Sequence, residues 1–127
     1  MVKNPEWFDV IVTTNMFGDI ITDLGSMLQG GMGIAASGNI HPGKTSMFEP
    51  IHGSAPKHAG KNVACPLGSV GAVSMMLDFL GETQAAARIE DAVSRLLASG
   101  KVPSADARSG IGTKEMGDMV VEELKGG

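Results

Sequence analysis

The chain has 127 residues, of which 43% are hydrophobic and 19% are charged, and its formal net charge is −4. This composition argues against disorder, and the acidic balance gives no electrostatic reason to bind nucleic acid or an anionic membrane. The longest uncharged stretch, residues 24–43, contains six glycines and Pro42, so it does not predict a membrane span. Cys65 is the single cysteine, which excludes an internal disulfide. Since the N-terminus also lacks the apolar run of a secretory signal, the sequence predicts a cytoplasmic protein.

The N-terminal half predicts one strand, one helix and a long irregular segment. Residues 8–14 are rich in β-branched side chains and predict a short, largely buried strand. A helix that ends at Gly30 and Gly31 is predicted by apolar residues at three- and four-residue spacing: Phe17, Ile20, Ile21, Leu24 and Leu28. Residues 30–62 are rich in Gly, Pro, Ser and His, which predicts mostly loops with one or two short strands.

The C-terminal half predicts three helices. Pro66 opens the first at a position where its missing N–H costs nothing, and Gly81 ends it. The second covers about residues 83–98 and ends at Gly100; after a connection over residues 101–112, Thr113 is expected to cap the third. The apolar stripes of the three helices are Val70, Val73, Met76, Leu77 and Leu80; Ile89, Val93, Leu96 and Leu97; and Met116, Val120, Val121 and Leu124. This order of elements predicts an α/β layer structure with part of its sheet absent.

Two glycine motifs match nucleotide-binding patterns, but their surroundings differ from those that the patterns need. Residues 31–36 fit G-x-G-x-x-A, which binds a pyrophosphate between a strand and a helix N-terminus, yet a helix is predicted before them. Residues 38–45 fit the P-loop spacing G-x-x-x-x-G-K-T, which needs a helix directly after the threonine. Pro50 follows too soon for such a helix, so a glycine-bounded surface turn is favoured over an NTPase site. His41 has no partner at a recognisable metal-ligand spacing, so no zinc site is predicted.

Two further groups of residues suit the binding of a ligand. Residues 52–62 combine small residues with two histidines and two lysines, which suits either a surface loop or contact with a nucleotide. Asp19 and Asp23 lie four residues apart, on a predicted helix face that they share with Thr22 and Ser26. Two carboxylates in this arrangement suit a hard divalent cation, and the alternative is an ordinary solvated pair near a helix N-terminus.

The longest motif spans residues 15–23, N-M-F-G-D-I-I-T-D, and is followed by Q-G-G-M-G over residues 29–33. Together they closely resemble the signature of the β-decarboxylating dehydrogenases, the family of isocitrate and 3-isopropylmalate dehydrogenases. Residues 48–56, F-E-P-I-H-G-S-A-P, resemble the adenosine-binding loop of that family, and residues 75–81 and 112–118 resemble its two later helices. The resemblance implies the three-layer α/β fold of these enzymes, of which this chain would be the C-terminal portion.

The resemblance also implies a metal- and NAD(P)-dependent oxidative decarboxylation of a 2-hydroxy acid. Residues 35–40, A-A-S-G-N-I, look most like the sequences of 3-isopropylmalate dehydrogenase, an enzyme of leucine biosynthesis. Asp19 and Asp23 match the helix carboxylates that bind Mg²⁺ or Mn²⁺ in the family. The residues that match its cofactor contacts are Glu49, His52, Gly53, Ser54, Ala55, Pro56, Lys57, His58, Ala59, Gly60, Asn62 and Cys65. Lys57 stands where NAD-preferring relatives carry an acidic residue, which favours NADP. Cys65 stands where the family has an asparagine that hydrogen-bonds the adenine.

Family members are more than twice as long as this chain, and the resemblance places their other functional residues upstream of the matched part. These residues are an acid/base tyrosine and lysine, the arginines that bind substrate, and a third metal-binding aspartate. No catalytic residue is therefore expected in this chain, which contains no tyrosine. We expect residues 1–29 to end the inter-subunit domain and residues 30–127 to form the C-terminal part of the cofactor-binding domain.

The resemblance also sets the expected partners. They are a small-molecule 2-hydroxy acid, the missing N-terminal portion of the enzyme, and a second subunit in a homodimer. An apolar surface is expected where the missing portion packs. Two alternatives remain: a catalytically silent fragment that binds a nucleotide or metal, and the P-loop NTPase.

Overall fold

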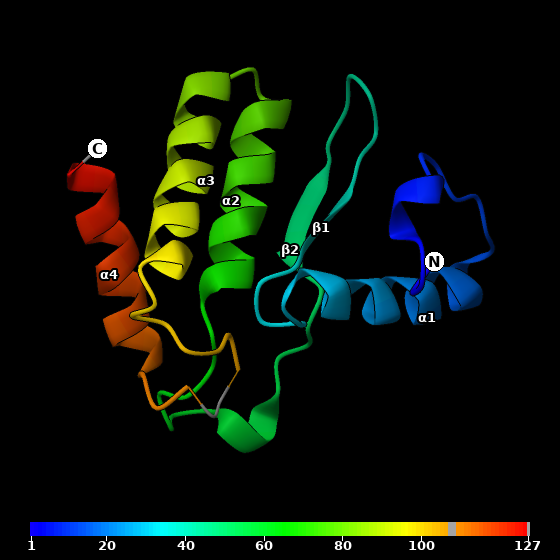
Figure 1. Ribbon diagram of the computed structural model, residues 1–127. Coiled ribbons are helices and arrows are strands. Elements are labelled where there is room, and N and C mark those ends of the chain that lie inside the picture. The colour runs from blue at the N-terminus through cyan, green and yellow to red at the C-terminus, as the bar shows by residue number, and fades with distance from the viewer. Residues whose placement is uncertain (107–108, 127) are drawn as a thin grey trace.

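The structure, a computed structural model, describes residues 1–106 and 109–126, and these form helices and one two-stranded sheet (Figure 1). In chain order the elements are η1 (Pro5–Trp7), α1 (Asn15–Ser26), η2 (Met27–Gln29), β1 (Ala36–Asn39), β2 (Met47–Pro50), η3 (Pro56–His58), α2 (Leu67–Phe79), α3 (Thr83–Ala98) and α4 (Thr113–Lys125). Helices α2, α3 and α4 stand side by side, α2 packs on the β1–β2 hairpin, and α1 lies on the far side of that hairpin (Figure 1). None of the helices in these described ranges is long and apolar enough to cross a bilayer.

The hydrophobic core lies between α2, α3 and α4. Leu67, Leu96 and Met116, one from each helix, are almost completely buried and belong to one cluster. On α3 the periodicity predicted the buried face well, since Leu96 is buried and Val93 packs against the core cluster. These contacts make the three C-terminal helices one packed unit that supports the rest of the chain.

Helix α2 buries its predicted apolar stripe only in part, since Val70 packs against the core cluster but other members do not. Val73 and Leu80 are exposed, whereas Gly68, Ala72 and Ser74 are buried. The reason is that α2 packs against both the hairpin and α3, so small residues are needed where the backbones approach. A Cβ atom at Gly68 would lie 3.1 Å from the carbonyl oxygen of Ala35. The large apolar side chains of α2 therefore lie beside this close contact and not in it.

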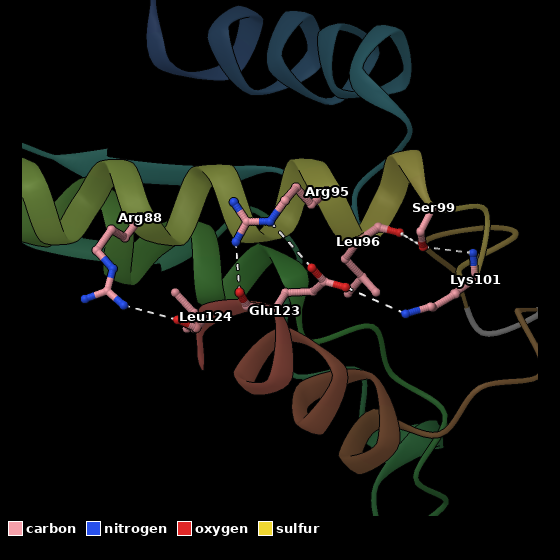
Figure 2. Close-up of polar contacts among 7 residues, drawn as sticks. All are labelled: Arg88, Arg95, Leu96, Ser99, Lys101, Glu123 and Leu124. Carbon is pink, nitrogen blue, oxygen red and sulfur yellow. Dashed lines mark hydrogen bonds and ion pairs between the residues drawn. The ribbon is translucent and has the colours of Figure 1, made fainter. Parts of the chain in front are cut away.

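Two arginines of α3 hold the C-terminal end of α4 (Figure 2). Arg88 Nη2 donates to the carbonyl oxygen of Leu124 at 3.1 Å, and Arg95 Nη2 donates to that of Glu123 at 2.8 Å. The Glu123 carboxylate also lies 3.5 Å from Arg95 Nε and 3.7 Å from Lys101 Nζ. The last carbonyls of a helix have no partner within it, so these donors satisfy groups that would otherwise depend on water.

The N-terminal segment contradicts one prediction. Residues 8–14 do not form a strand, and Val10 and Val12 are 81% and 93% exposed. A strand needs a neighbour to accept and donate its backbone hydrogen bonds, and no described segment pairs with this one. The helix after it is confirmed as α1 and η2, which end at Gly30 with φ +114°. The expected exposed apolar surface is present on these two helices: Met16, Phe17, Ile20, Leu24, Met27 and Leu28.

The start of α4 corrects a second prediction. Thr113 is the first residue of this helix and not its cap, because its Oγ1 donates to the carbonyl oxygen of Ala64 at 2.6 Å. Asn62 fulfils the capping role from a distant part of the chain, since its Oδ1 accepts from the Lys114 N–H at 3.0 Å. The predicted connection over residues 101–112 includes residues 107 and 108, which lie outside the described ranges.

Candidate functional site

The segment that matches the P-loop spacing forms the β1–β2 hairpin. Its antiparallel register pairs Ser37 with Glu49 and Gly38 with Phe48. Lys44 therefore lies in the hairpin turn, where its N–H donates to the carbonyl oxygen of His41 at 3.1 Å, and strand β2 follows. A P-loop needs a helix N-terminus at this point, so the arrangement excludes the NTPase site and confirms the predicted surface turn.

The other glycine motif, residues 31–36, also lacks the surroundings of a dinucleotide-binding turn. It leads from η2 into strand β1, and no helix follows it. The glycines serve close packing here. A Cβ atom at Gly33 would overlap the carbonyl oxygen of Ala105 and lie 3.0 Å from the Cβ atom of Cys65.

The two aspartates of α1 face a cleft of about 500 Å³ that runs between α1 and the end of the hairpin. Asp19 and Asp23 form one wall, and Glu49, His52 and Gly53 contribute to the other. The fold thus brings the predicted metal carboxylates together with three of the predicted cofactor residues. This cleft joins parts of the chain that the sequence could associate only through the resemblance.

Neighbouring polar groups order the side of α1 that carries the aspartates. Asn15 Nδ2 donates to Asp19 Oδ2 at 3.2 Å. Ser26 was expected on the polar face with the aspartates, but it is 4% exposed and its Oγ donates to the carbonyl oxygen of Asp23 at 2.7 Å. Ser26 therefore stabilises the end of α1 and does not line the cleft.

The donor set on α1 fits a hard divalent cation in part. Both aspartates are exposed, and carboxylate oxygens four residues apart on a helix suit Mg²⁺ or Mn²⁺. No group of three or more His, Cys, Asp or Glu side chains that could hold a metal occurs in the described ranges. A cation held here would therefore take most of its remaining ligands from water, substrate or other residues.

Residues 52–62, for which contact with a nucleotide is predicted, are called the nucleotide loop. Short-range hydrogen bonds around η3 fold this loop. The His58 N–H donates to the carbonyl oxygen of Ala55 at 2.8 Å, and the Lys61 N–H donates to that of His58 at 3.1 Å. Ala55 has φ +43°, a left-handed conformation that is uncommon for a residue other than glycine. Such strain persists only where the surrounding structure holds it, and it is frequent at ligand-binding loops.

This loop borders two hollows of about 560 and 500 Å³. Both hollows share part of their lining, namely His52, Gly53, Ala55, His58 and Ala64. The ring of His52 is oriented by its neighbour, because its Nδ1 lies 3.0 Å from the carbonyl oxygen of Gly53. Since a carbonyl oxygen only accepts, Nδ1 is the donor in this contact.

The other predicted cofactor residues divide into those that reach the hollows and those that do not. Ser54, Ala59, Gly60 and Asn62 line the second hollow, and Cys65 lines the first. Pro56 and Lys57 are exposed on η3 and line neither of them. Within the loop, the Asn62 carboxamide oxygen is already used by α4, so its contact with a cofactor would have to come from its remaining atoms.

Cys65 is placed mainly in the core. It is 9% exposed, and its thiol donates to the sulfur of Met116 at 3.6 Å. Burial raises the pKa of the Cys65 thiol, the negative charge of Asp106 raises it further, and a hydrogen bond from the Leu67 backbone N–H opposes both. The thiol is therefore held in its neutral, unreactive form.

Sequence reasoning missed several residues that line the first hollow. They are Met27, Met32, Ala105 and Asp106. Ala105 and Asp106 are more than 40 residues from the loop, so no spacing rule could have associated them with it. The G-G-M-G run over residues 30–33 was the available signal, because glycines at this density indicate close approach of backbone segments.

Comparisons with known proteins agree with this arrangement. Residues 1–120 match the family model described as isocitrate/isopropylmalate dehydrogenase. The chain is 53% identical over 123 residues to 3-isopropylmalate dehydrogenase of Nocardia farcinica, covering 94% of this chain and 34% of the relative. It is 49% identical to isocitrate/homoisocitrate dehydrogenase of Thermus thermophilus, covering 98% and 37%. The chain thus spans about a third of the length of the curated relatives it matches.

Solved structures give the same result. The crystal structure of isocitrate dehydrogenase from Methylococcus capsulatus superposes with a TM-score of 0.89 at 42% identity, over 98% of this chain and 37% of that one. The apo β-decarboxylating dehydrogenase of Thermococcus kodakarensis superposes with a TM-score of 0.84 at 36% identity, over 98% and 36%. The predicted α/β fold class, a portion of the isocitrate/isopropylmalate dehydrogenase fold, is confirmed. The chain belongs to the isocitrate/isopropylmalate dehydrogenase family.

Proposed function

We propose that this chain supplies the metal-binding carboxylates and the cofactor-binding loop of an enzyme that oxidatively decarboxylates a 2-hydroxy acid. The observation that carries the proposal is the cleft in which Asp19 and Asp23 lie opposite Glu49, His52 and Gly53. His52 and Gly53 also border both hollows of the nucleotide loop. A cation on the α1 side and a dinucleotide on the loop side would therefore meet in one continuous site, which transfer of a hydride between substrate and cofactor requires.

Asp19 and Asp23 would hold Mg²⁺ or Mn²⁺ at the α1 side of the cleft. When bound, the cation supplies Lewis-acid stabilisation of negative charge on the substrate oxygens. The hydrogen bond from Asn15 fixes one oxygen of Asp19 and limits the rotamers of that carboxylate before the cation arrives. The acid and base groups of the reaction are expected from the rest of the enzyme, because none is assigned to this chain.

The nucleotide loop would bind the adenosine half of NAD or NADP. Its small residues allow the ligand to lie against backbone, and His52 and His58 offer ring nitrogens beside both hollows. Lys57 is exposed at η3 within this loop, and its ammonium would contact the 2′-phosphate of NADP. A charge-assisted hydrogen bond is worth about 1.5–3 kcal/mol, so we propose a preference for NADP.

The names of the relatives support a proposal for the substrate, and the family resemblance supports one for the assembly. We propose a substrate of the 3-isopropylmalate type, a 2-hydroxy acid whose second carboxylate leaves as CO₂. The complete enzyme would work as a cytoplasmic homodimer. Residues 1–29 would belong to its inter-subunit domain and residues 30–127 to its cofactor-binding domain. The weak packing between α1 and the helices α2–α4 supports such a division.

A chimera tests the proposal. The upstream two-thirds of the Nocardia farcinica relative would be fused to this chain at the start of the matched region, with the intact relative as positive control. We expect reduction of NAD or NADP when 3-isopropylmalate and Mn²⁺ are supplied, and no reduction by the 127-residue chain alone. A folded chimera that binds cofactor but oxidises none of 3-isopropylmalate, isocitrate, homoisocitrate or malate would contradict the proposed activity. That result would favour the silent binding fragment.

A further inference from the structure

We propose that Thr113, at the start of α4, is a positioning residue for the nucleotide loop. It acts by fixing the C-terminal end of that loop against a rigid helix. The proposal rests on the proposed function, since it concerns the affinity of the same loop for a dinucleotide.

Three hydrogen bonds join α4 to the end of the loop; together they are called the Asn62–Thr113 contact. Thr113 Oγ1 donates to the carbonyl oxygen of Ala64 at 2.6 Å, and the Thr113 N–H donates to that of Asn62 at 3.0 Å. The Lys114 N–H donates to Asn62 Oδ1 at 3.0 Å. The contact thus connects residues about fifty positions apart in the sequence, and it satisfies two of the N–H groups that a helix N-terminus leaves without partners.

The loop needs such an anchor because its other backbone bonds are local. The bonds around η3 join residues three apart, and they fix the shape of the turn but not its place on the protein. At the N-terminal side, the Ile51 N–H donates to the carbonyl oxygen of Ala35 at 3.1 Å. At the C-terminal side, the Asn62–Thr113 contact has the corresponding role. The loop is therefore held at two points, of which one depends on α4.

The backbone of Asn62 gives the contact a second consequence. Asn62 has φ +55°, in the left-handed region that residues other than glycine rarely adopt. Its side chain is held by Lys114 and its carbonyl by Thr113, so both halves of the residue are fixed in this conformation. Asn62, Val63, Ala64 and Thr113 together line the second hollow. A change in the contact therefore moves a wall of the space that would receive the cofactor.

Helix α4 is suited to this role because it is anchored independently. Met116 and Val120 are buried in the core, and Arg88 and Arg95 hold its C-terminal carbonyls. Loss of the Thr113 hydroxyl should therefore leave α4 in place while it loosens the end of the loop, which keeps only the two backbone N–H bonds to Asn62. Helix α4 therefore stays fixed, and the nucleotide loop is the part whose position changes when the contact is altered.

The test compares three substitutions in the full chain. Thr113→Val keeps the shape of the side chain but removes the hydroxyl, Thr113→Ser restores the hydroxyl, and Thr83→Val makes the same change at the first residue of α3. We expect Thr113→Val to weaken binding of NADPH and NADH about three- to tenfold, the range that corresponds to one neutral hydrogen bond. Thr113→Ser should recover most of the affinity, and Thr83→Val should bind as wild type does.

Two further readouts separate positioning from general loss of stability. In the chimera, Thr113→Val should raise KM for the cofactor and leave kcat unchanged, because the reacting groups are not touched. Hydrogen exchange of the Lys114 amide should become faster, since this N–H donates to Asn62 Oδ1, and Asn62 is held less firmly once the nearby bond to Ala64 is lost. If Thr113→Val fails to fold, Asn62→Gly removes a different bond of the same contact, the acceptor of the Lys114 N–H, and permits the same backbone conformation. It should weaken binding in the same direction.

The outcomes distinguish this proposal from the proposed function. If wild type binds NADPH or NADH and Thr113→Val binds equally well, the positioning role is wrong and the proposed function stands. If a folded wild type binds neither dinucleotide, both are wrong. A loss of affinity in Thr83→Val as large as in Thr113→Val would also overturn the positioning role, because the effect would then be one of general stability.

Discussion

Gly33→Ala is predicted to destabilise the protein strongly, although it adds only one methyl group. An ideal Cβ atom at Gly33 would overlap the carbonyl oxygen of Ala105 and lie 3.0 Å from the Cβ atom of Cys65. Both neighbours belong to the buried core cluster, so neither can move into solvent. The obstacle is backbone and not the flexible end of a side chain.

The size of the destabilisation follows from the core groups that must move to make room for the added methyl group. Overpacking a core by one methyl group typically costs about 1–3 kcal/mol. The carbonyl oxygen of Gly33 also accepts from the Gly68 N–H at 2.8 Å, so retreat of this segment weakens a bond to the start of α2, which is worth about 0.5–1.5 kcal/mol. Together these terms give about 2–4 kcal/mol, a large part of the 5–15 kcal/mol that is typical for a domain.

Urea denaturation followed by circular dichroism measures the change. Gly33→Ala should lower the midpoint by about 1–2 M if m lies near 2 kcal/mol/M. Gly117→Ala is the matched control, since a Cβ atom there has no neighbour within 4 Å and lies inside α4. It should raise stability by about 0.5–1 kcal/mol through helix propensity. Equal midpoints for Gly33→Ala and wild type would refute the close packing of residues 33 and 105.

Three further predictions concern the site. In the active chimera, Asp23→Asn should raise the Mn²⁺ concentration needed for half-maximal activity about tenfold or more, because one of the two paired carboxylates is lost. If the variant titrates with Mn²⁺ as wild type does, Asp19 and Asp23 are an ordinary solvated pair and not metal ligands. Lys57→Asp should reverse the ratio of dissociation constants for NADPH and NADH, and a ratio that stays unchanged at low and moderate salt would contradict the proposed NADP preference. Burial raises the pKa of the Cys65 thiol, so the folded state favours the protonated thiol. The stability that this thiol contributes is therefore complete below the ordinary thiol pKa of about 8.5 and is lost as the pH rises beyond that value. Cys65→Ala should therefore lose less stability than wild type between neutrality and about pH 10 in urea titrations, and equal losses would argue against a buried thiol.

The elements that local rules define were predictable from sequence. Helix α3 begins at Thr83 and ends before Gly100, whose φ of +72° is the left-handed conformation expected after a helix. Pro66 precedes α2, and the glycine-rich segment over residues 30–62 contains two short strands as predicted. In each case the signal and the structure that it specifies lie within a few residues of each other.

Apart from Ser26, whose hydroxyl donates within its own helix, the errors involve partners that are distant in the sequence. Residues 8–14 have the composition of a strand, but a strand forms only where another strand supplies hydrogen bonds. Thr113 has the residue type of a cap, yet its hydroxyl is taken by Ala64 and the capping oxygen comes from Asn62. Asp106 borders the same hollow as His52 without any spacing that could reveal it. Periodicity and capping rules describe one segment at a time and cannot predict such contacts.

Helix α1 shows how the dependence on distant contacts affects the candidate site itself. Its spacing correctly predicts that Asp19 and Asp23 share one face, and that face lines the cleft. The opposite side carries Phe17, Ile20 and Leu24, which are 56%, 59% and 49% exposed. A helix of 12 residues is marginal in water without tertiary packing. The arrangement of the two carboxylates therefore depends on another segment packing against the apolar side of α1. No described residue buries that side fully. The proposed affinity for a cation would thus be a property of the whole assembly, although both proposed ligands lie on one short segment of this chain.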